Sequence, residues 1–243
     1  MAQAVLGAIG QSAEAGKPAS GYCLGVPKTP IPLCTAHREC KAVGVHEDDR
    51  SHELEALLLA VRGCRVCEPH LPLGPRPLVQ MGRAARILIV GQAPGAQAHA
   101  SGIPWADRSG DRLRDWMGID IQPFYDPDRI ALVPIGLCYP GRGASGDLPP
   151  RRECAPLWHG RLLAQLPQPR LTLLVGRHAQ QYRLAASFTS VTSTVRDWRL
   201  HAPRVMPLPH PSTRNIAWFK ANPWFERELV PALRQSVRQV LGG

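Results

Sequence analysis

The amino-acid sequence predicts an α/β protein: a three-layer α/β/α sandwich with a central, mainly parallel four-stranded sheet. Four short apolar runs have the length and composition of strands buried on both faces, and they occupy residues 86–90, 130–135, 171–175 and 205–208. Helical stretches lie between these runs. Strands that alternate with helices form a parallel sheet with helices on both faces, because each crossover must return to the same edge.

The helices are predicted from apolar spacing and from capping residues. Ser51 is able to cap a helix, and the residues after it form an apolar face at helical spacing: Leu54, Leu57, Leu58 and Val61. Further helices are expected near residues 110–117, 152–166 and 178–185, and a closing helix from about 223 to 240. Ligands of such sheets bind beyond the carboxyl ends of the strands, so the segments that follow the four runs are expected to form the site.

The chain of 243 residues is expected to form one domain over residues 51–243, preceded by a flexible or irregular arm over residues 1–50. The arm contains Gly, Ala, Pro and Ser without sustained periodicity. No apolar run reaches the roughly 18 residues of a membrane helix. The short apolar segment at residues 4–9 has no basic stretch before it, which argues against a secretory signal. The expectation is a cytoplasmic, bacterial-type monomer without membrane contact.

The formal charge of +10 results from 29 basic and 19 acidic residues. A basic surface attracts polyanions, and contacts with phosphates give an affinity for nucleic acid that does not depend on sequence. Of the basic residues 25 are Arg, so an arginine-rich genome composition is an alternative explanation of the charge. Nucleic acid is the partner class that the charge favours.

Four of the seven cysteines form a pattern typical of a metal or cluster site. Cys64 and Cys67 form a Cys-x2-Cys pair, Cys138 follows the second predicted strand, and Cys154 lies 16 residues later. One tight turn can present two thiolates to the same ion or cluster, and two distant cysteines can complete the set. Four thiolates suit zinc as well as an iron–sulfur cluster, so the spacing leaves both open. The others follow no such spacing and are expected as free thiols in the arm: Cys23, Cys34 and Cys40.

Three loops resemble signatures of the uracil-DNA glycosylase superfamily, most closely its iron–sulfur-containing family 4. Residues 91–95, Gly-Gln-Ala-Pro-Gly, resemble the Gly-Glu-x-Pro-Gly signature after the first strand. Residues 102–105, Gly-Ile-Pro-Trp, with the Ser-Gly pair at 109–110, resemble the Gly-x-Pro-Phe segment and the helix that follows it. Residues 210–212, His-Pro-Ser, resemble the second signature. The resemblance covers roughly residues 53–241, and family 4 also carries cysteines at the four matching positions.

The resemblance implies a [4Fe-4S] cluster on Cys64, Cys67, Cys138 and Cys154. It also implies a monofunctional DNA glycosylase of base excision repair, which hydrolyses the N-glycosidic bond of a flipped-out uracil or other deaminated base in DNA. His210 would donate a hydrogen bond to the departing base, and Trp105 would stack on that base. The other residues implied to bind substrate are Gly91, Gln92, Ala93, Pro94 and Gly95 at the flipped nucleotide, and Ser212 and Arg214 at a phosphate or as a wedge.

Two departures from the family pattern concern catalysis and base recognition. Ala98 and His99 replace an acidic pair, so the candidates for orienting water are Asp107, Asp111 and His99. Pro134 stands where family 4 carries an Asn that reads the uracil edge. These departures motivate an alternative, a catalytically inactive iron–sulfur module that binds nucleic acid. A zinc-stabilised protein without a role on DNA is the third hypothesis.

Overall fold

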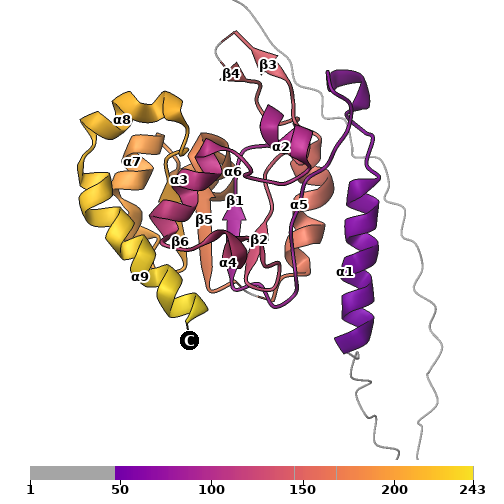
Figure 1. Ribbon diagram of the computed structural model, residues 1–243, viewed down its shortest axis with the longest axis horizontal. Helices are drawn as coiled ribbons and strands as arrows, with labels where there is room; N and C mark the ends of the chain where they lie inside the picture. Colours follow the sequence, from indigo (N-terminus) through magenta and orange to yellow (C-terminus); the bar gives the residue numbers. More distant parts are fainter. Residues whose placement is uncertain (1–46, 145, 168, 243) are drawn as a thin grey trace, which may run out of the picture. The chain divides into compact units, whose positions relative to one another are not determined.

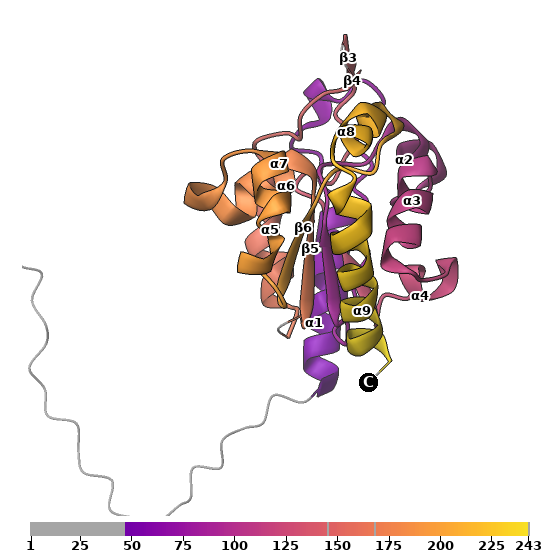
Figure 2. The ribbon, with the colours of Figure 1, turned by 90° about the vertical axis from the view of Figure 1, so that its left-hand side faces the viewer.

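The central sheet has four parallel strands in the order β2-β1-β5-β6. They are β1 (Ile87–Val90), β2 (Ile130–Leu132), β5 (Leu171–Val175) and β6 (Val205–Leu208). The structure is a computed structural model that describes residues 47–144, 146–167 and 169–242, with side chains from residue 50 onward. Helices cover both faces of the sheet (Figures 1 and 2). The predicted α/β/α sandwich is therefore confirmed, and all four predicted strands are present.

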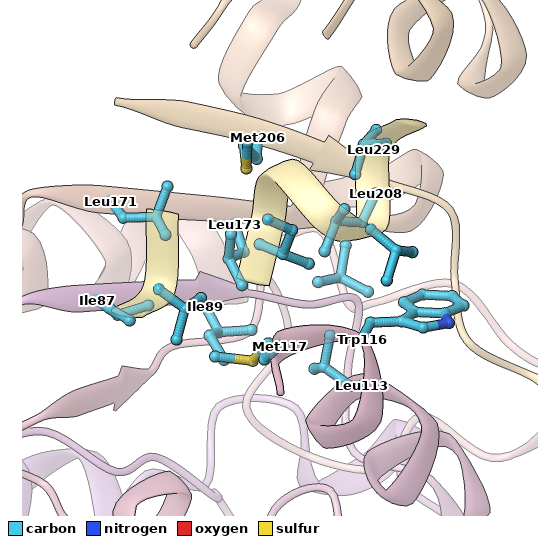
Figure 3. Close-up of a cluster of buried hydrophobic side chains, with 14 of the residues drawn as sticks. Ile87, Ile89, Leu113, Trp116, Met117, Leu171, Leu173, Met206, Leu208 and Leu229 are labelled. Atoms are coloured by element: carbon cyan, nitrogen blue, oxygen red, sulfur yellow. The ribbon is translucent and has the colours of Figure 1, made fainter. Parts of the chain in front are cut away.

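Alternation along the strands divides the hydrophobic core into two clusters, because successive side chains point to opposite faces of a sheet. Ile87 and Ile89 of β1 pack with α3 (Arg108–Met117) and α9 (Val230–Leu241), and Figure 3 shows them beside the side chains of α3. Leu88 and Val90 pack on the other face with three helices: α1 (Glu47–Arg62), α5 (Cys154–Ala164) and α6 (Gly176–Leu184). Burial on both faces explains why the strands are apolar at nearly every position, Thr172 of β5 being polar.

Several helix boundaries differ from the predicted ones. Helix α1 begins at Glu47, so the prediction that Ser51 caps it is wrong: the acidic residues 47–49 extend the helical segment toward the N-terminus. The closing segment is not one regular helix, because a π-helical turn at Phe225–Leu229 precedes α9. Helix α5 spans fewer residues than the 152–166 expected. Periodicity locates such helices well and their ends poorly, since end positions depend on capping and packing.

Several shorter elements lie between the main helices and strands. They are α2 (Ala96–Ser101), α4 (Ile121–Tyr125), α7 (Val191–Arg196), α8 (Ile216–Ala221) and a two-stranded antiparallel hairpin of β3 (Arg142–Gly143) and β4 (Gly146–Asp147). Short 3-10 turns lie at Glu68–His70, Ala185–Ser187, Trp198–Leu200 and Thr213–Asn215. Figure 1 shows α2, α8 and the hairpin at the end of the sheet toward which β1 points. These elements are too short for apolar periodicity to reveal them.

The arm expected over residues 1–50, with Cys23, Cys34 and Cys40, lies almost entirely outside the described residues. Within the described part of the chain, no helix is both long enough and apolar enough to span a membrane.

Candidate active site and thiol cluster

A pocket of about 370 Å³ opens at the carboxyl end of the sheet. The loop after β1, the segment before α3, the hairpin and the loop after β6 all contribute to its wall. The wall contains every residue expected from the sequence to bind substrate, together with two candidate catalytic residues: Gly91, Gln92, Ala93, Pro94, Gly95, Trp105, Ser212 and Arg214, with Asp107 and His210. Segments that are far apart in the sequence meet here because parallel strands end at the same edge.

Trp105 fits in the pocket wall because two residues beside it, Gly91 and Gly110, have no side chains. Its φ of 59° lies in the left-handed region, which is uncommon for a residue other than glycine. A β-carbon on Gly91 would lie 2.9 Å from Cζ2 of the indole, and one on Gly110 would lie 1.8 Å from the Trp105 carbonyl oxygen. The indole stacks on the His210 imidazole, with ring centroids 5.8 Å apart and planes inclined by 27°. Glycine at positions 91 and 110 is therefore needed for the ring and its backbone to fit.

His210 follows β6 and presents a neutral imidazole to the pocket. Asn215 Nδ2 donates a hydrogen bond of 2.7 Å to the His210 carbonyl oxygen and so holds the loop. Burial lowers the pKa of His210, and the negative charges of Asp107 and Asp147 oppose that effect. Its Nδ1 is buried and has no hydrogen-bond partner among the described residues. A neutral imidazole of this kind is able to donate an N–H to a substrate atom.

Two carboxylates border the pocket on either side of Gly95. Asp107 caps α3: its Oδ1 accepts a hydrogen bond of 2.9 Å from Gly110 N. Its Oδ2 lies 3.9 Å from the place of a β-carbon on Gly95, and Oδ2 of Asp147 lies 3.6 Å from the same place. Asp147 belongs to β4 and was missed in the sequence analysis. The sequence gives no periodic pattern for the hairpin that carries Asp147. The one feature that could have drawn attention to Asp147 is its place between Cys138 and Cys154.

The other two catalytic candidates lie outside the pocket wall. Asp111 forms an ion pair of 2.5 Å with Arg114, and its side chain is 71% exposed. His99 lies on α2, where its ring is 6.1 Å from that of Tyr139. Its carbonyl oxygen accepts a hydrogen bond of 2.6 Å from Arg76. Of the three candidates for orienting water, the structure brings only Asp107 to the pocket.

Pro134 lines the pocket at the position where family 4 carries Asn. It has no side-chain donor or acceptor. Its carbonyl oxygen lies 2.8 Å from Nε2 of the buried His159, on α5, so the backbone oxygen already has a partner. The pocket therefore provides no polar group to a base from this residue.

The four expected ligand cysteines line one small cavity beside α5. The remaining wall is mainly apolar and includes Leu71, Leu137, Leu157 and Trp158. Burial raises the pKa of the Cys138 thiol to about 11 and that of the Cys154 thiol to about 12. Negative charge on such buried sulfurs requires compensation by a bound cation or by donors.

N–H groups of four described residues already face these sulfurs, and one of them is the backbone N–H of Arg76, which donates to Cys138. Leu137 N donates to Cys154 Sγ at 3.2 Å, and Trp158 Nε1 donates to Cys64 Sγ at 3.3 Å. The Arg151 guanidinium donates a hydrogen bond to Cys67, which opposes the rise in the Cys67 pKa caused by burial. Donors of this kind stabilise sulfur in its thiolate form.

The four thiols are the kind of donor set that binds a metal ion or an iron–sulfur cluster. Among the described residues, no group of three or more His, Cys, Asp or Glu side chains is placed to hold one metal ion. A zinc ion bonded to sulfur at about 2.3 Å would bring its four thiolates within about 4 Å of one another. Four thiols around one apolar cavity suit four-cysteine ligation of an iron–sulfur cluster, and the same four thiols are donors that zinc also takes.

Comparison with known proteins bears on the same segments. Residues 79–234, more than half of the chain, match the sequence model of the uracil DNA glycosylase superfamily. The chain belongs to this superfamily. The matched range includes all three signature loops, Cys138 and Cys154, and begins after Cys64 and Cys67. Among solved structures, the chain is similar to the solution NMR structure of a "putative Uracil DNA glycosylase" from Methanosarcina acetivorans. The two are 18% identical, the match covers 66% of this chain and 98% of that one, and the TM-score is 0.40.

Proposed function

We propose that this chain is a DNA glycosylase that hydrolyses the N-glycosidic bond of a flipped-out uracil or other deaminated base. The observation that carries the proposal is the pocket at the carboxyl end of the sheet. There Trp105, His210 and the loop at residues 91–95 converge in a member of the uracil DNA glycosylase superfamily. A base cannot be attacked inside a duplex, so an open pocket with a stacking ring is what this reaction needs.

The roles of the residues follow from their positions. The indole of Trp105 offers a face on which a base can stack, and stacking of this kind contributes about 1–3 kcal/mol per base. The neutral His210 donates a hydrogen bond to the base oxygen as negative charge develops on the departing base. Close approach of the nucleotide backbone is possible at Gly91 and Gly95, which have no side chains. Ser212 and Arg214, which belong to the pocket wall, would contact a phosphate.

Base release from duplex and single-stranded oligonucleotides containing uracil, hypoxanthine or xanthine tests the proposal. We expect wild-type protein to produce abasic sites on at least one of these substrates. His210→Ala should slow release by about 100-fold or more, the usual effect of removing a preorganised donor, and should leave the circular dichroism spectrum unchanged. His52→Ala is the control, because this side chain on α1 is 80% exposed and distant from the pocket wall.

The alternative function is a catalytically inactive module that binds nucleic acid. The observation that favours it is Pro134, which leaves the pocket without a side-chain group to read the base at that position. This alternative predicts salt-sensitive binding of DNA and no base release on any of the substrates above. A screen in which no base is released while DNA binds well would decide for it.

We also propose that Cys64, Cys67, Cys138 and Cys154 hold a [4Fe-4S] cluster. Their common cavity, its apolar wall and the N–H donors that face the sulfurs support this proposal. The contribution of a bound cluster at this place is structural, since its ligands would join the segment after α1 to both ends of the loop that carries the hairpin.

Anaerobically purified protein tests the cluster directly. We expect a brown preparation with broad absorbance at about 400 nm. Chemical analysis should find iron and inorganic sulfide in the protein. Cys154→Ser should lose the colour and the iron, whereas Cys40→Ser, a change in a cysteine outside the ligand set, should keep both. A colourless protein with stoichiometric zinc would contradict the cluster.

A further inference from the structure

Asp147 reaches the pocket from a hairpin that packs against the loop after β6. In β4, Asp147 is paired with Arg142 of β3, and Leu148 N donates a hydrogen bond of 2.9 Å to Gly141 O at the base of the hairpin. The guanidinium of Arg214, in the loop after β6, packs directly against Gly146: a β-carbon there would lie 1.7 Å from Nη1. The hairpin is therefore held against the loop that carries His210.

We propose that Asp147 is the carboxylate that activates the attacking water and stabilises the positive charge on the deoxyribose during base release. This inference rests on the proposed glycosylase function and assigns a residue to the step that the three sequence-derived candidates left without a clear base. Its Oδ2 lies 3.6 Å from the place of a β-carbon on Gly95, in the loop expected to face the flipped nucleotide.

Asp107, the other carboxylate of the pocket, has a different structural task. One of its oxygens accepts the hydrogen bond that caps α3, so this carboxylate is fixed as a static charge. Asp147 is an exposed residue on a short hairpin and forms no ion pair with any described residue. Both charges act on the His210 imidazole across the pocket. The two carboxylates therefore surround the place where a cationic sugar would form, and Asp147 is the one whose oxygens are not used by a helix cap.

The chemical step balances with these groups alone. The bond between C1′ and the base nitrogen breaks, and its electron pair stays on the base, whose oxygen accepts a hydrogen bond from His210. The electron-poor C1′ gains a bond to the oxygen of a water molecule, and that water loses one proton to the carboxylate of Asp147. The proton then returns through solvent to the base anion. The products are the free neutral base and an abasic sugar, and Asp147 is again ionised.

Single-turnover kinetics test this role on the substrate that wild type cleaves. Asp147→Asn should slow base release by about 100-fold or more at unchanged substrate affinity, because the lost group acts after binding. Asp147→Glu should recover part of the rate, since it restores a carboxylate. Asp120→Asn is the control, because Asp120 is an exposed residue before α4 whose side chain makes no capping hydrogen bond. A wild-type rate in Asp147→Asn would overturn the assignment.

A binding experiment separates this inference from the proposed function, because it needs no turnover. Two duplexes are compared, one with a neutral tetrahydrofuran abasic analogue and one with a cationic pyrrolidine analogue. Wild type should bind the pyrrolidine duplex about tenfold or more tightly, and Asp147→Asn should lose most of this preference. A chain that releases no base but keeps the Asp147-dependent preference contradicts hydrolysis and water activation, and supports only the contact of Asp147 with a cationic sugar. Equal discrimination by wild type and Asp147→Asn overturns the assignment even if base is released.

Discussion

His159 illustrates how a single buried residue contributes a pH dependence. It lies on α5 with 1% of its surface exposed, and its Nε2 is 2.8 Å from the Pro134 carbonyl oxygen. Burial lowers the pKa of His159, the positive charge of Arg183 acts in the same direction, and the hydrogen bond with Pro134 opposes both. The edge of the Tyr182 ring also packs against it. The imidazole is therefore neutral in the folded protein at a pH where an unfolded chain would already bind a proton.

The free energy of unfolding should consequently fall as the pH decreases. The unfolded state binds a proton near pH 6.5, whereas folded His159 remains neutral below that value, so stability is lost from about pH 6.5 down to the folded pKa. Urea unfolding between pH 7.5 and 5.5 measures this loss. His159→Gln should reduce it but not remove it, because burial also lowers the pKa of His178 and His210. An identical pH slope in His159→Gln and the exposed-site control His52→Gln would contradict the assignment.

At the scale of elements, two helical glycines look alike in sequence and differ in their surroundings. Gly110 lies in α3, where a β-carbon would lie 1.8 Å from the Trp105 carbonyl oxygen. Gly160 lies in α5, where no atom other than those of the neighbouring helix backbone stands within 4 Å of that place. Glycine lowers helix stability by about 0.5–1 kcal/mol relative to alanine when nothing else distinguishes the two. The surroundings therefore predict opposite effects for the same substitution.

Gly160→Ala should raise the free energy of unfolding by up to about 1 kcal/mol, because α5 gains helix propensity without a clash. Gly110→Ala should lower it by about 1–3 kcal/mol, since the Trp105 segment must move away from α3. Urea unfolding of the two variants provides the comparison. Base release should also fall in Gly110→Ala alone, because Trp105 belongs to the pocket wall. A stabilised Gly110→Ala variant would show that the contact is not restrictive.

At the scale of the whole molecule, the charge of +10 predicts how affinity for DNA responds to salt. Each phosphate that a basic side chain neutralises releases counterions, and the slope of log K against log salt becomes steeper by about 0.9 per phosphate on duplex DNA. Arg142, an exposed residue on the hairpin, is placed beside the pocket opening through its pairing with Asp147. Arg170 lies just before β5, at the amino ends of the strands and therefore at the end of the sheet opposite the pocket.

Arg142→Gln should reduce the magnitude of the salt slope by about one unit, because one phosphate contact is lost without a change in base recognition. Arg170→Gln should leave the slope unchanged. Fluorescence anisotropy of a labelled duplex at several salt concentrations provides the measurement. If both variants changed the slope equally, the hairpin face would not be the surface that binds DNA.

Local sequence properties were sufficient for the sheet, for the main helices and for the residues of three pocket loops. Apolar runs of strand length, helical spacing of Leu and Val, and Gly-rich segments directly after strands are all features of neighbouring residues, so the sequence alone reveals them. The thiol positions belong to the same class: their spacing indicated a common ligand group, and the structure brings the four side chains to one cavity.

Only the tertiary structure separated Asp107 and Asp147 from Asp111 and His99. Asp107 and Asp111 lie one helical turn apart in the chain, and the direction in which α3 packs decides that the first borders the pocket while the second pairs with Arg114. Asp147 reaches the pocket through a hairpin with two-residue strands, which carries no periodic signal. That hairpin is held by Arg214, a residue distant in sequence, and contacts of this kind arise from packing between segments.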